Sequence, residues 1–354
     1  MRLMVKISMR DRTRRRLGLR GRRRPNTGAT HSEHPDREWA EMDWNQHVRG
    51  AAVRGRYVHY VDVGTGRPVV LTHGQGGAWQ WWLRVIPAVA RHHRVIALDL
   101  AGFGASEPVG AGDVFEEQVA TVVGLLDELR LAKATIVGHS MGGLVSLKVA
   151  CDHPHRVDGL MLIGSGSNIM GPARLRAILL GFRLFDRVFR FPTVPRIIVR
   201  WRRLRAAFFK LAVAETHHIT RSLAAELVPR MAAPGFIAGM EAAGKAVGEA
   251  TPEAVRAPAL VVWGRGDRIV PLSSGRQLAA AIPDAQLVVL DDVAHCAMLE
   301  KPAETAALII DFVRDPRAGR AARDSATDVV DRDDSQAGAR IAQWENTFGE
   351  ENWG

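Results

Sequence analysis

Cysteine is nearly absent from this chain of 354 residues, and long apolar runs are missing altogether. The two cysteines, Cys151 and Cys296, fall in unrelated expected elements, so a disulfide framework is not expected and a reducing compartment is compatible. No segment stays apolar for the ~20 residues that a membrane span needs, because arginines interrupt the runs. The first residues hold no apolar core of signal-peptide length. We therefore expect a cytoplasmic protein.

Clustered metal ligands are missing as well. Although the chain has 13 histidines, no group of His, Cys, Asp or Glu shows ligand spacing such as H-E-x-x-H or paired C-x-x-C. We therefore predict that the protein holds no metal and needs no cofactor.

Negative charge is scarce in two stretches of a chain whose net charge is +10. Residues 1–24 hold eleven Arg and Lys against a single Asp, and residues 171–210 hold eleven against a single Asp. Each stretch carries a net charge of +10, so the remaining residues sum to −10. A mildly acidic body thus carries two strongly basic attachments.

The first attachment belongs to a polar segment, residues 1–43, which lacks apolar periodicity and is predicted to be disordered. Its basic residues indicate either a solvated tail or a tether to an anionic surface, and no specific nucleic-acid partner is expected. Residues 315–354 are rich in Asp, Arg, Ser and Ala and are also predicted to be disordered.

The motif G-H-S-M-G-G at 138–143 directly follows the apolar run Ala134 to Val137. A G-x-S-x-G turn between a strand and a helix holds its serine on a strained bend, and the glycines allow strand and helix to approach closely. By itself the motif also fits a plain glycine-rich turn. A nucleophilic serine further needs a base, an acid that orients the base, and donors for an oxyanion.

Three other expected strand ends carry residues suited to those needs. The segment H-G-Q-G-G at 73–77 follows the strand at 69–71, Asp267 follows the strand at 259–264, and His295 follows the strand at 285–290. The chain order is therefore Ser140, Asp267, His295. That order distinguishes this arrangement from two other well-known serine triads.

From about Tyr57 to Arg314 the sequence resembles the α/β-hydrolase superfamily. The matching segments are HGQGG at 73–77, RVIALDLAGFGASEP at 94–108, GHSMGG at 138–143, WGRGDRIVP at 263–271 and AHCAMLEKP at 294–302. The resemblance implies an α/β fold with a mostly parallel, doubly wound sheet. It places the core at 44–166 and 251–314. A helical cap at 167–250 is inserted before the acid-bearing strand.

The resemblance also assigns roles. Ser140 is the nucleophile, His295 the general base and Asp267 the orienting acid. The backbone N–H groups of Gln75 and Met141 form the oxyanion hole, and the supporting residues are His73, Gly74, Gly138 and Gly142. Two acidic rivals near the base, Asp291 and Asp292, are expected on a solvated loop, and the ring of His139 is expected to point away from the chemistry.

The second basic attachment lies in the expected cap. Apolar residues recur at helical spacing from 175 to 189, and arginines occupy other positions, namely Arg176, Arg183, Arg187 and Arg190. Such a helix either packs its apolar stripe on the core, or lines an apolar pocket while its basic face attracts an anionic interface. Weak contact with an anionic membrane, through the cap or the tail, is therefore a hypothesis.

The nucleophile narrows the chemistry within the superfamily. Epoxide hydrolases and haloalkane dehalogenases carry an aspartate where this chain has Ser140, and epoxide opening relies on cap tyrosines, whereas Tyr57 and Tyr60 are the only tyrosines here. The prediction is a hydrolase that cleaves a small hydrophobic carboxylic ester through an acyl-enzyme.

Other members with the same triad stay open as alternatives. They are carbon–carbon bond hydrolases of aromatic degradation, acyltransferases and cofactor-free peroxidases. Cys296 counts against the first class, because those enzymes usually carry an aromatic residue directly after the base. A non-catalytic binding scaffold is disfavoured by the intact triad.

Overall fold

The computed structural model describes residues 36–110, 113–165 and 251–317, together with part of the segment between 180 and 239. In that segment the described residues are 180–181, 183, 187–189, 191, 193–231, 233, 235–236 and 238–239. Most of the amphipathic stretch at 174–190 and most of both expected tails lie outside the described residues.

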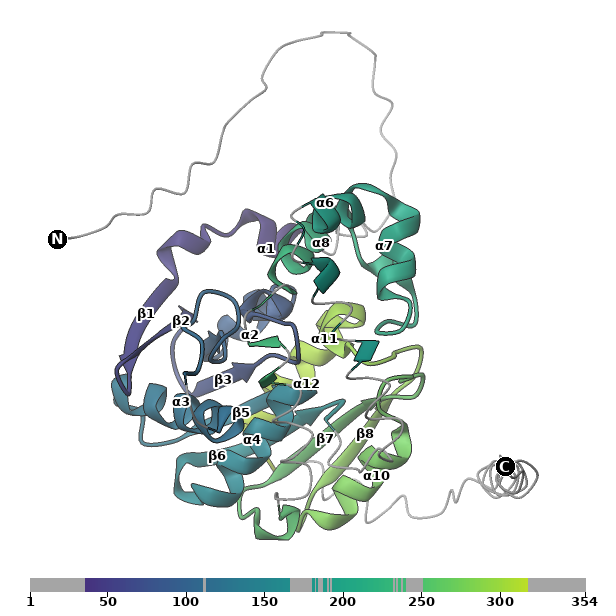
Figure 1. Ribbon diagram of the computed structural model, residues 1–354. Coiled ribbons are helices and arrows are strands. Elements are labelled where there is room, and N and C mark those ends of the chain that lie inside the picture. The colour runs from purple at the N-terminus through teal and green to yellow at the C-terminus, as the bar shows by residue number, and fades with distance from the viewer. Residues whose placement is uncertain are drawn as a thin grey trace, which may run out of the picture. The chain divides into compact units, whose positions relative to one another are not determined.

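An eight-stranded sheet forms the centre of the molecule (Figure 1). Its strands are β1 (Val48–Val53), β2 (Arg56–Val63), β3 (Pro68–Thr72), β4 (Arg94–Leu98), β5 (Ala134–His139), β6 (Val157–Ile163), β7 (Ala259–Gly264) and β8 (Gln286–Leu290). The spatial order is β1-β2-β4-β3-β5-β6-β7-β8. The first two strands are antiparallel to their neighbours, and the pairs from β4 to β8 are parallel. The mostly parallel sheet expected from the sequence is confirmed.

Alternating side chains of these strands build two separate cores. Val69 and Leu71 of β3 belong to one cluster and Val70 to the other, since successive side chains of a strand point to opposite faces. A strand buried on both faces tends to be a continuous apolar run, which is why Val and Leu make up more than half of β3 and half of β7.

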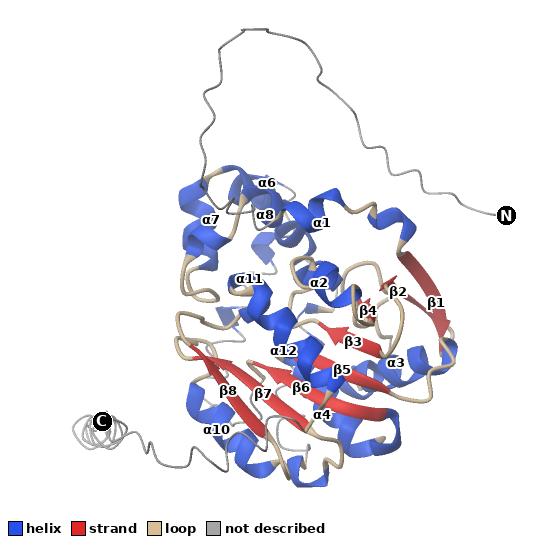
Figure 2. Ribbon diagram, turned by 180° about the vertical axis from the view of Figure 1, so that it is seen from behind, coloured by secondary structure: helices blue, strands red, loops and turns tan. Residues whose placement is uncertain are grey.

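Helices cover both faces of the sheet (Figures 1 and 2). One core contains side chains of α2 (Ile86–Ala90), α11 (Ala297–Glu300) and α12 (Pro302–Arg314). The other contains side chains of α3 (Val114–Glu128), α4 (Met141–Asp152) and α10 (Leu272–Ala281). Short 3-10 turns complete the body, namely η1 (Trp44–Gln46), η2 (Trp79–Trp82), η3 (Pro154–Arg156) and η6 (Pro252–Ala254).

The described residues between β6 and β7 are mainly helical. They form α6 (Thr193–Arg200), α7 (Arg202–Phe209), η4 (Thr216–His218), α8 (Arg221–Leu227) and η5 (Val228–Met231). The Gly235 N–H donates to the Gly102 carbonyl at 2.9 Å, so this helical segment, at the position of the expected cap and called the cap segment below, is bonded to a loop that follows a core strand.

The N-terminal part of the body begins earlier than the sequence suggested. Residues Arg37–Glu41 form α1, and Trp39 is 7% exposed and belongs to the core cluster of α2 and α12. The boundary expected at residue 43 is therefore too late, because Trp39 buries an aromatic ring that a polar tail would leave in water.

No helix within the described ranges is long and apolar enough to cross a membrane.

Candidate active site

Ser140 occupies a sharp turn between β5 and α4. Its φ of 51° and ψ of −120° lie in a region that non-glycine residues rarely adopt, so the turn is strained. A Cβ on Gly138 would lie 2.5 Å from the Gly143 Cα, and one on Gly142 would lie 2.3 Å from the His73 carbonyl oxygen. Both glycines are therefore required for the close approach of α4 to β5 and β3.

Asp267 and His295 form a buried pair at the carboxyl ends of β7 and β8. The Asp267 Oδ2 is 2.7 Å from the His295 Nδ1, and their side chains are 0% and 6% exposed. The other carboxylate oxygen accepts from the N–H groups of Ile269 at 2.8 Å and Val270 at 2.9 Å. These bonds fix the carboxylate, and through it the orientation of the imidazole.

Asp291 and Asp292, the two other acidic residues near His295 in the sequence, lie on the surface, as expected. Asp291 pairs with Arg265 at 2.6 Å on the surface, and the hydrogen bond from Arg265 holds the pKa of that carboxyl below its usual value. Asp292 is exposed and has a positive φ of 56°. Among the described residues, Asp267 is the one carboxylate bonded to His295.

His139 lies beside His295, and the expectation that its ring points away is wrong. Its ring centroid is 4.8 Å from that of His295 and 6.1 Å from the stacked ring of Trp81. Its Nε2 donates to the His295 carbonyl oxygen at 3.0 Å. Burial, reinforced by neighbouring His295, holds the pKa of His139 well below its usual value, so this imidazole is neutral.

His73 braces the loop that follows β3. Its Nδ1 donates to the Gly74 carbonyl at 2.8 Å, and its Nε2 accepts from the Leu100 N–H at 3.0 Å. Because a backbone N–H can only donate, these two bonds select one neutral tautomer, in agreement with the burial that lowers the pKa of His73. A ring with both nitrogens engaged in this way has no lone pair for a metal.

The loop after His73 brings Gly74 next to Ser140, and Gln75 follows it. A Cβ on Gly74 would lie 3.1 Å from the Ser140 Cβ and 2.7 Å from the His139 Nδ1. The Gln75 side-chain amide donates to the Phe236 carbonyl of the cap. The backbone N–H groups of Gln75 and Met141 donate to no protein group in the described part of the chain, which leaves them available to an oxyanion.

His139 links the turn of Ser140 to the loop of His295. His139 precedes the serine and donates to the carbonyl of the base, whereas no hydrogen bond joins the Ser140 Oγ to His295 in the described structure. Such catalytic bonds often tighten only when substrate is bound.

Glu300 is a buried carboxylate that the sequence reasoning missed. Its Oε1 accepts from the Ala294 N–H at 2.9 Å and its Oε2 from the Ala214 N–H at 2.6 Å. The His295 N–H also donates to the Ala212 carbonyl at 3.1 Å. The loop that carries the base is thus bonded to the cap segment after α7. An acidic residue in an otherwise apolar helix after His295 was the available signal.

Cys296 is a packing residue. It is 1% exposed, and burial raises the pKa of its thiol well above the usual value, so the thiolate needed for a nucleophile does not form. As for metals, no group of three or more His, Cys, Asp and Glu side chains in the described ranges could hold an ion.

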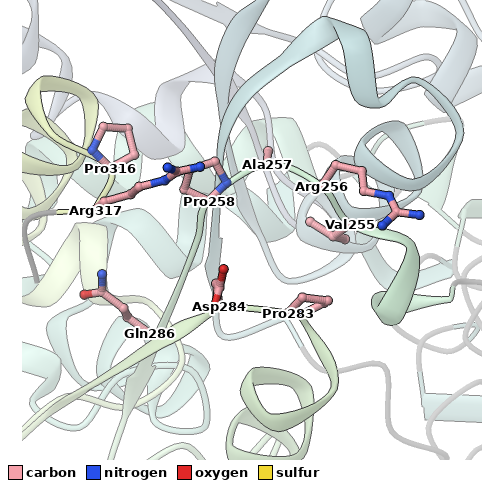
Figure 3. Close-up of a pocket in the computed structure, with 9 residues that line it drawn as sticks. All are labelled: Val255, Arg256, Ala257, Pro258, Pro283, Asp284, Gln286, Pro316 and Arg317. Atoms are coloured by element: carbon pink, nitrogen blue, oxygen red, sulfur yellow. The ribbon is translucent and has the colours of Figure 1, made fainter. Parts of the chain in front are cut away.

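A cavity of about 180 Å³ lies at the other end of the sheet (Figure 3). It is lined by residues that precede β7 and β8, together with Pro316 and Arg317. Ser140, Asp267 and His295 follow the carboxyl ends of their strands, so this cavity is separate from their chemistry.

Residues 67–302 match the family model described as the alpha/beta hydrolase fold. A 2-hydroxy-6-oxononadienedioate/2-hydroxy-6-oxononatrienedioate hydrolase of Paraburkholderia xenovorans LB400 is 32% identical over 266 residues, covering 72% of this chain and 90% of its own. A 2-hydroxy-6-oxo-6-phenylhexa-2,4-dienoate hydrolase of Comamonas testosteroni is 32% identical over 276 residues, covering 73% and 91%.

Solved structures that resemble this chain include a hydrolase of a related name. Two variants of a meta-cleavage product hydrolase, one of them from Pseudomonas fluorescens IP01, superpose with TM-scores of 0.62 and 0.61. They are 26% and 25% identical, and the matches cover 76% of this chain and 99% and 98% of theirs.

These names overturn the prediction of a carboxylic ester hydrolase. A 2-hydroxy-6-oxo-dienoate contains no ester, so a hydrolase named for it must break the carbon–carbon bond beside the 6-oxo group. Cys296 is therefore not sufficient evidence against a carbon–carbon bond hydrolase. The serine motif could not separate the two classes, because an ester and a ketone both offer a carbonyl carbon that a serine can attack.

Proposed function

Because the chain belongs to the alpha/beta hydrolase fold family, we propose that it hydrolyses the carbon–carbon bond next to the ketone of a 2-hydroxy-6-oxo-dienoate. The observation that carries this proposal is 32% identity to hydrolases named for such substrates, over most of both chains. The Asp267–His295 pair beside the strained Ser140 supports it, since ketone cleavage by water needs an activated nucleophile.

The leaving group dictates the first step. Carbon 5 can depart with the bonding electrons only if they delocalise, so the substrate must first move its 2-hydroxyl proton to carbon 5 and become a ketone at carbon 2. The bond between carbons 5 and 6 then breaks to give an extended enolate, with its charge on the oxygen at carbon 2.

We assign the remaining steps to the three residues at the strand ends. Ser140 attacks carbon 6 while its proton passes to His295, and Asp267 holds the imidazole and offsets its positive charge. The oxyanion at carbon 6 accepts from the N–H groups of Gln75 and Met141. His295 then protonates the departing enolate. Water, activated by the same imidazole, hydrolyses the acyl-serine to a carboxylate and restores the Ser140 hydroxyl.

The surroundings of the oxyanion loop favour an apolar group on carbon 6. Gly76, at φ 69°, lies against Phe236 and Met231, since a Cβ on it would be 2.6 Å and 3.7 Å from their side chains. Trp81, 6% exposed, stacks on His139. An aromatic or alkyl substituent would find apolar neighbours there.

The test is a turnover assay with 2-hydroxy-6-oxo-6-phenylhexa-2,4-dienoate. The full chain should bleach the absorption of the conjugated substrate and release benzoate and 2-hydroxypenta-2,4-dienoate in equal amounts. Ser140→Ala should abolish release, whereas Ser273→Ala, an exposed serine of α10, should retain it. A folded wild-type chain that leaves this substrate and its alkyl-substituted analogues intact would overturn the proposal.

A further inference from the structure

Exposed apolar side chains gather on one part of the cap. Seven of the eight large hydrophobic residues that are exposed in the described structure lie between positions 180 and 211, and the eighth is Tyr57. The seven are Leu180, Val188, Phe191, Ile197, Trp201, Leu204 and Leu211. Trp201 is 59% exposed and Phe191 63%. A folded chain leaves a tryptophan this exposed at a cost, unless another apolar phase covers it.

Most of the same segment carries positive charge without negative charge. From Arg187 to Ala214 the sequence contains seven arginines, one lysine and no acidic residue. Five of these cations are exposed and lie on or beside α6 and α7, namely Arg196, Arg200, Arg202, Arg203 and Lys210. We call these five cations, with Phe191, Ile197, Trp201, Leu204 and Leu211, the α6–α7 surface.

This surface is not the face that packs on the body. Pro195 and Phe209 are the buried residues of α6 and α7, and Phe209 joins the core cluster beneath them. Arg205 points inward to the carbonyls of Val199 and Ile219. The exposed apolar side chains are therefore additional to those that the fold needs. Both views place α6 and α7 at the end of the cap away from the sheet (Figures 1 and 2).

We propose that the α6–α7 surface docks on an anionic lipid bilayer. Aliphatic and tryptophan side chains enter the boundary between headgroups and acyl chains, and arginines among them bind the phosphates. A second copy of the chain would cover the apolar side chains but would bring the same positive charges against them. An anionic bilayer meets both requirements.

Docking would bring the cap, and not the sheet, to the lipid. The surface ends at Leu211, and the next residue, Ala212, accepts the hydrogen bond from the His295 N–H. The bilayer would therefore lie against the segment that is bonded to the loop of the base. The docking does not depend on which bond the enzyme cleaves.

Co-sedimentation with vesicles tests the docking. The full chain should pellet with vesicles of phosphatidylglycerol mixed into phosphatidylcholine, and much less with phosphatidylcholine alone. Binding should fall as salt rises, because attraction to the surface is screened over about 10 Å at 0.1 M ionic strength. Failure to pellet with anionic vesicles, or equal binding to both kinds, would overturn the proposal.

Paired variants locate the contact. Arg202→Gln with Arg203→Gln should weaken binding about fivefold for each arginine, whereas the matched pair Arg130→Gln with Arg256→Gln, exposed elsewhere, should not. Ile197→Gln, Trp201→Gln and Leu204→Gln together should also release the chain, and Tyr57→Gln should not. Circular dichroism should show all four proteins folded, since the changed side chains are exposed.

The basic residues 1–24 are unchanged in every variant. A loss of binding in a variant therefore comes from the α6–α7 surface and not from residues 1–24. Full binding by the arginine variant and by the apolar variant would assign the contact to another part of the chain and overturn the proposal. Lipids brominated on their acyl chains should quench the fluorescence of the wild type, and the Trp201→Phe protein should lose that quenching. A wild type that dimerises in sedimentation velocity while the apolar variant is monomeric would show an interface between copies instead.

Discussion

Three residues at the site are held in states that water would not favour. Ser140 adopts a strained backbone conformation, Asp267 is a fully buried carboxylate, and His139 is a buried imidazole with a strongly lowered pKa. Neighbours maintain each state: the glycines of the turn allow the conformation of Ser140, two backbone N–H groups hold Asp267, and burial beside His295 lowers the pKa of His139. Single substitutions at these residues should therefore change both activity and stability.

Asp267→Asn should leave the fold intact and lower kcat on the dienoate by about 10⁴-fold, because an amide no longer holds the imidazole in the required tautomer or balances its charge. Stopped assays with the purified variant measure the loss. Asp292→Asn is the control and should keep near-wild-type turnover. If both variants lost activity equally, the assignment of the acid would be wrong.

His139 should make stability depend on pH. Its pKa is lowered in the folded chain, so below about pH 6.5 the unfolded chain binds a proton that the folded chain does not. The free energy of unfolding should therefore fall as pH drops from about 7 to about 5.5, by up to about 1.4 kcal/mol per unit from this group. Urea denaturation of the wild type and of His139→Asn measures the slope, and the variant should be shallower. Identical slopes would contradict the prediction.

At the scale of elements, the loop of the base and the cap segment after α7 behave as one unit. Glu300 bridges the N–H groups of Ala214 and Ala294, while the His295 N–H reaches the Ala212 carbonyl. Burial raises the pKa of Glu300, and the backbone donors around it oppose that effect. A carboxylate is well suited to this position because it offers acceptors in two directions.

Glu300→Gln should weaken the link between the His295 loop and the cap segment. The NH₂ group of the glutamine amide must face a backbone N–H, so a buried donor is left without an acceptor. The expected cost is about 1–3 kcal/mol of unfolding free energy. Hydrogen exchange should rise in residues 212–214 and 294–296, and kcat should fall more than KM rises. Glu304→Gln, whose side chain is 53% exposed beside Lys301, is the matched control. Unchanged exchange in both segments would show that Glu300 does not position the base.

At the scale of the whole molecule, Asp36 joins three distant parts of the chain. It accepts from the Arg84 Nε at 2.8 Å, from Ser222 at 2.8 Å, from Trp39 at 3.1 Å and from Thr220. Arg84 in turn donates to the Leu299 carbonyl at 2.7 Å. Burial alone raises the pKa of Asp36, but the Thr220 hydrogen bond and the charge of Arg84 outweigh it, so the pKa is lowered overall. Residues 36–41 thus link the cap to the body.

Asp36→Asn should destabilise the protein by about 3–5 kcal/mol, because it leaves the buried Arg84 guanidinium uncompensated. Glu38→Gln breaks the neighbouring surface pair with Arg91, which is about half exposed, and should cost less than about 1 kcal/mol. Urea denaturation of both variants gives the comparison. Since the pKa of Asp36 is lowered, its contribution should be complete at neutral pH and disappear as pH falls below about 4. Equal losses for the two variants would contradict this account.

Exhaustive dialysis against EDTA should leave dienoate hydrolysis unchanged, because the proposed steps use only Ser140, Asp267, His295 and backbone donors. Turnover before and after dialysis checks this. Activity that is lost and then restored by a divalent ion would refute it.

The sequence by itself determined the parallel sheet, the turn that carries Ser140 and the placement of Asp267 and His295 after later strands. These features follow local rules, since apolar strand runs and glycine spacing act within a few residues. Only the tertiary structure decided that His139 faces His295, that Glu300 holds the cap, and that Asp36 bonds Thr220, 184 positions later. Such contacts join residues from separate elements, and no periodicity records them. The proposed cleavage of a carbon–carbon bond rests on neither source but on the names of the relatives, because a serine can attack the carbonyl carbon of an ester or of a ketone.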